Sequence, residues 1–307
     1  MKWGNRRVLI TGIAGFIGQN LAKRLLDKGA YVIGFDNFSY GKRENIPVSV
    51  NEMITGDVLN KENLVKIKEV DYVFHLGSPS SVVLFNKDPI SCFHATVCGF
   101  LNILEWAKQR NVEKIVYPSS GSVYGNTPLP QSEDIPPKPV NLYGIAKLTC
   151  EILAKKYFNE VPNIGLRIFA GYGPGEWHKG EFASVVTLFL KSIMANEPPI
   201  IYGDGSQKRD FVYIDDIVSS FLASVERGIR NTIVNVGSGK AYSFNEVIDL
   251  INSLLGTNIK PRYVPKPNSY LENTLSDIRR MKRLLGVNPM GLEEGLKKYL
   301  DWLKLSR

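Results

Sequence analysis

A tyrosine and a lysine one helical turn apart are the residues of this sequence best suited to chemistry on an alcohol. Tyr143 and Lys147 stand at positions i and i+4 of a predicted helix, so their side chains lie on one face. A pair of this kind is also common on solvent-exposed helices. A free phenol titrates near pH ~10 and is a poor base at neutral pH, but a neighbouring ammonium favours the phenolate. We therefore expect a lowered pKa for Tyr143, which lets it remove a substrate hydroxyl proton.

Two serines at the end of a predicted strand supply a hydroxyl for the same chemistry. Ser119 and Ser120 follow the apolar run 114–118, and the glycine-rich segment 121–125 then turns the chain away. Ligands of open parallel sheets bind at the carboxyl ends of the strands. One of the two hydroxyls is therefore placed to orient the oxygen on which Tyr143 acts.

A glycine-rich turn between a strand and a helix predicts a dinucleotide site near the N-terminus. Its sequence is TGIAGFIG. Gly12 permits the tight turn, Gly15 lets backbone N–H groups approach a pyrophosphate, and Gly18 lets helix and strand pack closely. The first helical residues, Phe16 and Ile17, then turn the positive end of the helix dipole toward the phosphates.

An acidic residue at the end of the next predicted strand indicates which dinucleotide is bound. Asp36 ends the run YVIGFD, where a carboxylate accepts hydrogen bonds from ribose hydroxyls and repels the 2′-phosphate of NADP. NAD is therefore favoured, and its positive nicotinamide would add to Lys147 in favouring the phenolate of Tyr143. Lys42 and Arg43 follow closely and offer charge for a phosphate, so NADP stays open.

A parallel sheet is needed to bring these residues together, and the sequence predicts one. Continuous apolar runs rich in valine and isoleucine indicate strands covered on both faces, and they alternate with segments of helical period. This βαβ rhythm is typical of a doubly wound α/β fold, the Rossmann fold. The predicted strands are 7–11, 31–36, 53–56, 72–76, 114–118 and 164–169, and the predicted helices are 16–28, 61–68, 89–110 and 143–158.

The alternation breaks down after about residue 170, which indicates a smaller C-terminal lobe. Turn-forming glycines crowd 171–180, and the later predicted elements are a strand at 232–236 and helices at 244–255 and 292–303. We expect residues 1–169 to form an NAD-binding Rossmann domain, which 210–240 rejoins. An α/β substrate-binding lobe would consist of residues 170–209 and 241–307.

Composition limits the classes of partner. The net charge is +8, but no basic run is interleaved with aromatic residues, which argues against nucleic acid as a partner. Attraction of an anionic small substrate explains the charge, and so does solubility alone. No apolar run reaches the roughly 20 residues that span a bilayer, so we expect no membrane partner and a cytoplasmic protein. Cys92, Cys98 and Cys150 form no metal-ligand pattern, and no metal site is predicted.

Taken together, the motifs resemble the extended short-chain dehydrogenase/reductase family, in particular its nucleotide-sugar epimerases and dehydratases. The similarity runs through nearly the whole chain. Its markers are TGIAGFIG (11–18), FDN (35–37), GDV (56–58), FHLGS (74–78), SSGSVYG (119–125), YGIAK (143–147), LRIFAGYGPGE (166–176), GDGSQKRDFVYIDDI (203–217) and NVGSG (235–239).

The resemblance implies a role for each matching residue. Ser120 would be the catalytic partner of Tyr143 and Lys147. Arg209 would bind the diphosphate of a sugar nucleotide, although a surface arginine is the alternative. The further cofactor-binding residues that the resemblance implies are Asn37, Asp57 and Val58, the last two near adenine, and Leu76, Gly77 and Ser78 on the nicotinamide side. By itself, Asp57 is equally well placed to cap a helix.

Within the family, the serine segment separates two reactions. Dehydratases carry an acidic pair in the segment that here reads SGS (120–122), so elimination of water lacks its usual acid and base. The SSGSVYG form resembles the 4-epimerases, such as UDP-glucose 4-epimerase. The resemblance implies that a hydride passes to NAD, the 4-keto sugar turns over, and the hydride returns to its other face. We therefore expect an enzyme of the UDP-glucose/UDP-galactose 4-epimerase type acting on a UDP-hexose.

Several departures from the family pattern leave the sugar open. Ala170 and Thr96 replace two usual asparagines, and the late arginine is missing from the segment 270–274, which reads YLENT. The segment 173–185 is similar to a stretch of ADP-glycero-manno-heptose 6-epimerase. In such an enzyme Lys179 would be a second acid or base across the pocket from Tyr143, whereas a solvated loop lysine is the alternative.

Two competing functions follow from the same motifs. A reductase or dehydrogenase acting on another nucleotide-linked keto sugar would exchange its cofactor at every turnover. A non-enzymatic NAD-binding protein would share the fold, but the presence of Tyr143 and Lys147 argues against it. The family resemblance also implies a homodimer that pairs through the helices 89–110 and 143–158.

Overall fold

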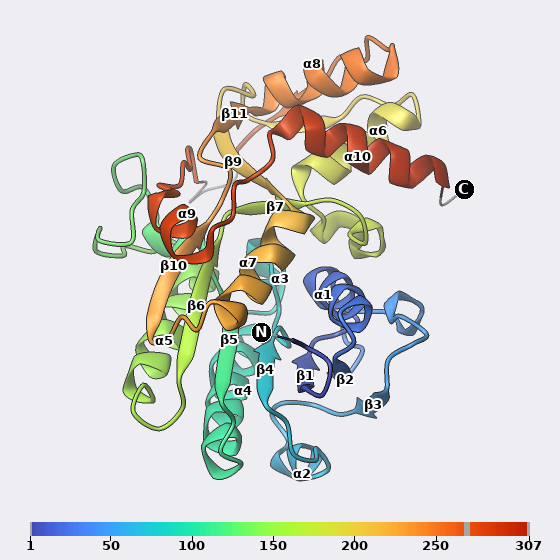
Figure 1. Ribbon diagram of the computed structural model, residues 1–307. Coiled ribbons are helices and arrows are strands. Elements are labelled where there is room, and N and C mark those ends of the chain that lie inside the picture. The colour runs from blue at the N-terminus through green and yellow to red at the C-terminus, as the bar shows by residue number, and fades with distance from the viewer. Residues whose placement is uncertain (1, 267–270, 306–307) are drawn as a thin grey trace.

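A seven-stranded sheet organises the computed structural model, which describes residues 2–266 and 271–305 (Figure 1). Its strands are β1 (Arg7–Thr11), β2 (Tyr31–Asp36), β3 (Glu52–Thr55), β4 (Tyr72–His75), β5 (Lys114–Ser120), β6 (Asn163–Ile168) and β10 (Thr232–Val236). They lie in the order β10-β6-β5-β4-β1-β2-β3, and all adjacent pairs are parallel. The predicted doubly wound α/β class is confirmed.

Each face of the sheet packs against its own layer of helices. In β1, Val8 and Ile10 belong to the core that contains α1 (Phe16–Asp27) and α7 (Ile214–Glu226). Leu9 belongs to the core on the other side, which α4 (Pro89–Gln109) and α5 (Leu142–Lys156) cover. Alternate side chains of a strand point to opposite faces, so a strand buried on both faces reads as a continuous apolar run. Two short helices, α2 (Lys61–Val65) and α3 (Val82–Lys87), contact α4.

A smaller lobe stands above the large sheet in Figure 1. Its strands are β7 (Ala170–Tyr172), β8 (Ile200–Tyr202), β9 (Lys208–Tyr213), β11 (Ala241–Ser243) and β12 (Arg262–Val264). They form a sheet in the order β11-β9-β7 and a separate pair, β12-β8. Three helices complete the lobe: α6 (Val185–Met194), α8 (Phe244–Leu255) and α10 (Leu292–Leu305). Their buried side chains continue the core of the α1 and α7 layer.

The path of the chain differs at two points from the boundaries expected from the sequence. Residues 210–213, expected to rejoin the Rossmann domain, belong to β9 and stay in the small sheet, whereas β10 pairs with β6 of the large sheet. Helix α9 (Arg279–Leu285), expected in the lobe, packs Met281 and Leu285 into the core beside α7 and β10. Since β10 is an edge strand, a helix beside it covers apolar surface that would otherwise be exposed.

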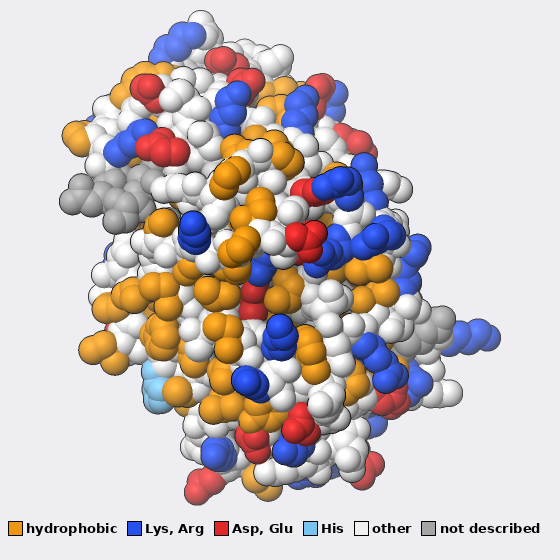
Figure 2. Space-filling model, turned by 90° about the vertical axis from the view of Figure 1, so that its left-hand side faces the viewer, with side chains coloured by type: hydrophobic (Ala, Val, Ile, Leu, Met, Phe, Trp, Pro, Cys, Tyr) orange, Lys and Arg blue, Asp and Glu red, His pale blue; other side chains and the backbone are white. Residues whose placement is uncertain are grey.

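Helix α4 corrects the expectation that no segment is long and apolar enough to span a membrane. Among the described residues it meets both criteria, although 44% of its most apolar window is buried in the protein. Phe100, Ile103 and Leu104 of α4 are buried against the sheet. Packing against the sheet therefore explains why the buried side of α4 is apolar. Figure 2 shows hydrophobic side chains gathered on the lower half of the molecular face that carries α5, the neighbour of α4.

Candidate active site

A cavity of about 830 Å³ lies between the carboxyl ends of the large-sheet strands and the smaller lobe. Parallel strands end at one edge of the sheet, so distant parts of the sequence meet there. The residues predicted from the sequence all line this cavity: Gly12, Gly15, Phe16, Ile17, Gly18, Asp36, Asn37, Asp57, Val58, Leu76, Gly77, Ser78, Ser120, Tyr143, Lys147, Lys179 and Arg209.

The glycine-rich turn has no room for larger residues. Gly12 has a φ of +70°, and a Cβ there would lie 2.5 Å from the main-chain oxygen of Leu76. A Cβ on Gly18 would lie 2.2 Å from the main-chain oxygen of Gly12. Helix α1 begins at this turn without a side-chain cap or a first-turn acid among the described residues. The first N–H groups of α1 therefore suit an anion such as a pyrophosphate.

Asp36 joins the turn to the loop that follows β2. Its Oδ2 accepts the N–H of Ala14 at 2.9 Å, and its Oδ1 accepts the N–H of Phe38 at 2.8 Å. Burial raises the pKa of Asp36, and these N–H bonds oppose that rise. Each carboxylate oxygen can accept more than one hydrogen bond, so Asp36 can also accept ribose hydroxyls. Arg43, considered for a 2′-phosphate, instead donates to Thr55 at 3.0 Å.

Asp57 does not cap a helix in this structure. The N-cap of α2 is Asn60, whose side chain accepts the N–H of Glu62. Asp57 instead accepts the N–H of Leu59 at 2.8 Å and the side-chain N–H of Asn37 at 2.9 Å. Asn37 and Asp57, both predicted to bind the cofactor, are therefore in contact.

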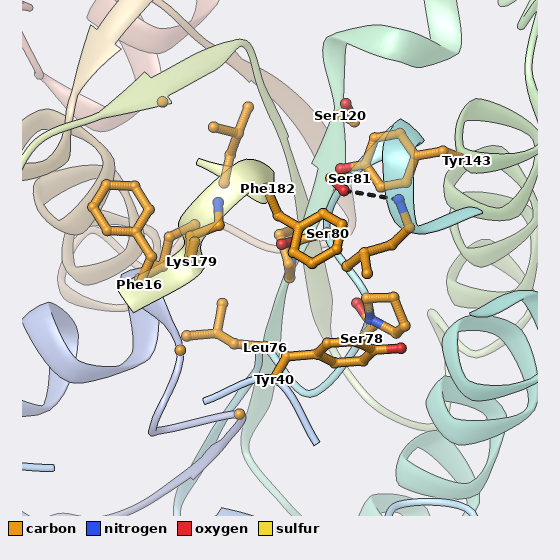
Figure 3. Close-up of a pocket in the computed structure, with 18 of the residues that line it drawn as sticks. Phe16, Tyr40, Leu76, Ser78, Ser80, Ser81, Ser120, Tyr143, Lys179 and Phe182 are labelled. Atoms are coloured by element: carbon orange, nitrogen blue, oxygen red, sulfur yellow. Dashed lines mark hydrogen bonds between the residues drawn. The ribbon is translucent and has the colours of Figure 1, made fainter. Parts of the chain in front are cut away.

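Ser120, Tyr143 and Lys147 all line the cavity, and Figure 3 shows Ser120 and Tyr143 on the same side of it. Ser120 ends β5, and the other two side chains come from the first turns of α5. The Nζ of Lys147 donates to the Oγ of Ser78 at 3.1 Å and lies 5.8 Å from the centre of the Tyr143 ring. The structure therefore brings the three predicted catalytic residues together. It also places Ser78, predicted to bind the cofactor, in contact with Lys147.

Burial dominates the protonation of this pair in the protein alone. Burial raises the pKa of Tyr143, and a hydrogen bond with Ser120 opposes the rise. Burial also lowers the pKa of Lys147. The expectation that Lys147 lowers the pKa of Tyr143 is therefore wrong for the protein alone. The physical reason is that both groups lose water, which disfavours each charged form, while the ammonium donates to Ser78.

Thr11 and His75 form a buried pair that the sequence analysis did not single out. The Oγ1 of Thr11 accepts the N–H groups of Leu76 and Gly77, each at 3.1 Å, and lies 2.9 Å from Nδ1 of His75. Because this oxygen already accepts two N–H groups, its own proton goes to Nδ1, and His75 is neutral. Burial lowers the pKa of His75 to about 3. The pair fixes the main chain that leads to Ser78, and both residues stand inside the motifs TGIAGFIG and FHLGS.

A buried ion pair ties the catalytic helix to the sheet. Glu151 follows Tyr143 and Lys147 at the same four-residue spacing on α5. Its carboxylate accepts Nε and Nη2 of Arg167 at 2.8 and 2.7 Å, and the Oγ of Ser119 at 2.5 Å. All three side chains are buried. The sequence analysis missed this network, and the repeat at 143, 147 and 151 is the signal by which Glu151 could have been found.

Lys179 lies across the cavity from Tyr143, on the opposite side of the view in Figure 3. Its Nζ pairs with Oε1 of Glu176 at 3.1 Å. Glu176 is only 1% exposed and also accepts the hydroxyls of Ser184 and Thr187, each at 2.7 Å. Lys179 is therefore neither a solvated loop lysine nor a free base, but the partner of a buried carboxylate.

Arg209 reaches the cavity from β9 of the smaller lobe. Its Nη1 donates to the main-chain oxygens of Lys208 at 2.9 Å and Glu272 at 2.8 Å. The guanidinium also lies over the ring of Phe244, 5.5 Å from its centre. Ala170 lines the same cavity. Tyr270, the first residue of the segment that lacks the family's late arginine, lies outside the described residues.

A glycine-rich turn, an acid at the end of β2 and a tyrosine–lysine pair on α5 define a dinucleotide-dependent enzyme of the short-chain dehydrogenase/reductase type. The model of the NAD dependent epimerase/dehydratase family matches residues 8–237, and the chain belongs to this family. NAD is its cofactor. The predictions of the family and of the cofactor are confirmed.

Known relatives cover nearly the whole chain. It is 32% identical to the UDP-glucose 4-epimerase of Mycolicibacterium smegmatis, over 97% of this chain and 98% of that protein. It is also 32% identical to the UDP-glucuronate 4-epimerase of Thermodesulfobacterium geofontis, over 96% and 95%. The solved UDP-glucose 4-epimerase of Thermotoga maritima with UDP-glucose superposes with a TM-score of 0.93, at 30% identity over 98% and 99% of the two chains. The chain is thus an NAD-dependent epimerase of the nucleotide-sugar class, as predicted.

Proposed function

We propose that this enzyme interconverts UDP-hexoses at C4, as UDP-glucose/UDP-galactose 4-epimerases do. The observation that carries the proposal is the hydroxyl-bearing segment 119–122 beside Tyr143, which has no carboxylate. The carboxylates among the described cavity residues are Asp36, Asp57 and Glu176. Asp36 ends β2, Asp57 follows β3, and Glu176 is paired with Lys179. A hydroxyl proton can therefore be removed at Tyr143, but water elimination has no acid–base pair there.

The residues of the chain divide the work of such a reaction. NAD, when bound, supplies a hydride acceptor that later returns the hydride. The uncapped start of α1 and the carboxylate of Asp36 would hold its phosphates and adenosine ribose. Tyr143 takes the proton from the sugar hydroxyl and gives it back after the ring has turned. Ser120 orients that hydroxyl, and Lys147 holds Ser78 in place.

Two observations support a UDP group on the substrate: the names of two relatives and the position of Arg209 in the smaller lobe. Two relatives are named for UDP-glucose and UDP-glucuronate, which supports a UDP-sugar. Arg209 lines the cavity from β9, and we assign the diphosphate to it. Phosphate oxygens would then exchange with the main-chain oxygens that its guanidinium now contacts, which a charge-assisted bond to phosphate favours.

A second candidate is an epimerase acting on another nucleotide-linked sugar, with Lys179 as a second acid or base. Its place opposite Tyr143 supports this candidate. The ion pair of Lys179 with the buried carboxylate of Glu176 supports a structural role instead, because a buried carboxylate is costly to leave without its partner. Lys179→Met would abolish turnover in the second candidate. In the first, we expect kcat within about tenfold of the parent value.

A sugar-nucleotide panel tests the proposal directly. The purified enzyme is incubated without added cofactor with UDP-glucose, UDP-galactose, UDP-glucuronate and GDP-, ADP- and CDP-sugars, and products are read by NMR. We expect inversion at C4 of a UDP-hexose with no net change in NAD redox state. If no sugar is converted, or if conversion needs stoichiometric NADH, the proposal is wrong.

Tyr143→Phe removes only the phenolic oxygen and tests the role given to it. We expect kcat to fall by at least a hundredfold, because general acid–base catalysis contributes on the order of 10²–10⁴ in rate. NAD should stay bound, since the ring remains. Equilibrium binding of NAD to the variant is the control, and full activity in Tyr143→Phe contradicts the assignment.

A further inference from the structure

Strand β9 carries a buried carboxylate next to Arg209. Arg209 and Phe211 line the cavity, and Asp210 stands between them on the strand. Alternate side chains of a strand point to opposite faces, so Asp210 points away from the cavity, and it is fully buried. A carboxylate taken out of water needs hydrogen-bond donors in place of that water. The donors to Asp210 therefore identify the segments that it holds together.

These donors come from two segments of the chain that lie far from β9 in the sequence. The first connects β10 of the large sheet with β11 of the smaller lobe (Figure 1). From it Ser238 donates its N–H and its hydroxyl, each at 2.6 Å, and Gly239 donates its N–H at 3.1 Å. The second is the segment 271–276, from which Ser276 donates its N–H at 2.9 Å and also its hydroxyl. Asp210 thus fixes β9 of the lobe to the end of a large-sheet strand.

The groups around this carboxylate are closely packed. A Cβ on Gly237 would lie 2.8 Å from Oδ2 of Asp210 and 2.3 Å from the Oγ of Ser276. The main-chain N–H of Asp210 also donates to the hydroxyl of Thr274 at 3.3 Å. Strand β9 therefore cannot shift against either segment without breaking several hydrogen bonds at once.

The segment 271–276 also surrounds Arg209. The guanidinium of Arg209 donates to the main-chain oxygens of Leu271 and Glu272. Leu271 and Thr274 line the cavity together with Arg209. Because Asp210 holds this segment as well as the strand that carries Arg209, it sets the place of the guanidinium in the cavity.

We propose that Asp210 is a positioning residue for nucleotide binding, which holds Arg209 where the diphosphate of the substrate binds. The inference rests on the proposed function, because that function assigns the diphosphate to Arg209. The residues assigned to the chemical step, Ser120, Tyr143 and Lys147, belong to β5 and α5 of the other lobe. Asp210 therefore acts on the affinity for the nucleotide and not on the chemical step.

Binding of UDP, measured without turnover, tests this role. Calorimetric titration gives the Kd of UDP for the NAD-loaded enzyme, and steady-state kinetics gives KM and kcat for the sugar nucleotide. Asp210→Asn keeps the shape of the side chain but turns one acceptor oxygen into a donor that faces N–H and hydroxyl groups. We expect UDP to bind roughly tenfold more weakly and KM to rise by the same factor, while kcat stays within about threefold of the parent. An unchanged Kd for UDP overturns the proposal.

Dependence on Arg209 makes the test specific. Arg209→Met should weaken UDP binding at least as much as Asp210→Asn. The double variant should bind UDP no more weakly than Arg209→Met alone, because Asp210 acts through the guanidinium. If the two losses multiply in the double variant, Asp210 does not position Arg209 and the proposal is wrong.

A buried carboxylate elsewhere in the protein serves as the control. Asp216 of α7 is 8% exposed and accepts the N–H of Met290 at 2.9 Å. Asp216→Asn should leave the Kd of UDP unchanged, and the affinity for NAD should equal that of the parent in every variant. A change of similar size in Asp216→Asn would mean that UDP binding responds to any loss of stability, which contradicts the proposal.

A milder variant keeps the test decisive if Asp210→Asn does not fold. Ser276→Ala removes one donor and leaves the carboxylate in place, and we expect UDP to bind about threefold more weakly. An enzyme that binds UDP but converts no sugar refutes the proposed function alone. Unchanged UDP binding in both Asp210→Asn and Ser276→Ala refutes the positioning role alone, and a parent enzyme that binds no UDP refutes both.

Discussion

At the scale of single residues, the chemistry of Tyr143 depends on two opposing effects. Burial favours the neutral phenol, while the hydrogen bond with Ser120 favours the phenolate. Lys147 contacts Ser78 and the ring of Tyr143, and burial has already weakened its own hold on a proton. Ser120 is therefore the described side chain that most directly stabilises the form of Tyr143 that accepts a proton.

Removal of the Ser120 hydroxyl should shift the pH dependence of kcat. The phenolate forms as pH rises through the pKa of Tyr143. Ser120→Ala removes a bond that lowers this pKa, so the pKa rises and the acidic limb moves to higher pH. At neutral pH we expect kcat to fall on the order of a hundredfold. The measurement is a pH–kcat profile of both proteins.

The neighbouring Ser122 provides the control for this experiment. Only its main-chain N–H contacts Ser120, so Ser122→Ala should keep the limb in place. An acidic limb that stays at the parental pH in Ser120→Ala would show that the Ser120 hydroxyl does not stabilise the phenolate.

At the scale of elements, α5 is positioned by a charged contact at its centre. Glu151 accepts from Arg167 on β6 and from Ser119 on β5, so one carboxylate links the helix that carries Tyr143 to two strand ends. The loss of one partner from a buried ion pair leaves an uncompensated charge. The network is therefore a point where folding stability and active-site geometry depend on the same side chains.

Glu151→Ala should lower the free energy of unfolding by about 3–5 kcal/mol, the usual loss when one partner of a buried pair is removed. Urea denaturation followed by circular dichroism measures the change. Glu293, which pairs with Lys297 at 2.6 Å on the exposed face of α10, is the control, and Glu293→Ala should leave the free energy of unfolding nearly unchanged. Equal effects of the two substitutions would contradict the importance of the buried pair.

Helices and strands were predicted correctly from the sequence where their apolar residues follow a regular pattern, and were missed where they do not. The six strands with continuous apolar runs and the helices α1, α4, α5 and α8 agree with the structure to within about two residues at each end. Helix α7 was not predicted; it is buried nearly all round, so that even its polar residues Asp216, Ser220 and Ser224 lie inside the protein. Helix α9 and the short strands of the lobe are stabilised mainly by contacts with segments far away in the sequence, which no local pattern indicates.

At the scale of the whole molecule, exposed apolar side chains lie on three neighbouring helices, α3, α4 and α5. Exposed apolar side chains on these helices are Val83, Ile90, Leu142, Ile145 and Ile152. Those on α5 repeat at helical spacing, and Figure 2 shows how hydrophobic side chains gather on this side of the molecule. We propose a homodimer through α4 and α5, because a face of this kind is costly to leave in water.

A charge placed on this face should dissociate the dimer. Ile152 is 56% exposed in the single chain, and Ile152→Asp would bury a charge at the interface. We expect light scattering to give twice 34.4 kDa for the parent at micromolar concentration and 34.4 kDa for the variant. Val65→Asp, on α2 and 68% exposed, should remain dimeric. A monomeric parent protein contradicts the proposal.

The sequence by itself determined the α/β fold and the family, favoured NAD as the cofactor and predicted the residues that line the site. The dinucleotide site and the reacting pair follow from local spacing: glycines where backbone approaches closely, an acid at the end of a strand, and a tyrosine and lysine one helical turn apart. The family and the remaining site residues follow from the resemblance of the motifs. Such patterns depend on neighbours within a few residues.

Only the tertiary structure decided how those residues are held and charged. It paired Lys179 with Glu176, set Arg209 against main-chain oxygens, and raised the pKa of Tyr143. The physical reason is that desolvation and hydrogen-bond partners depend on which segments the fold brings together, and segments far apart in the chain leave no local pattern that records their contact.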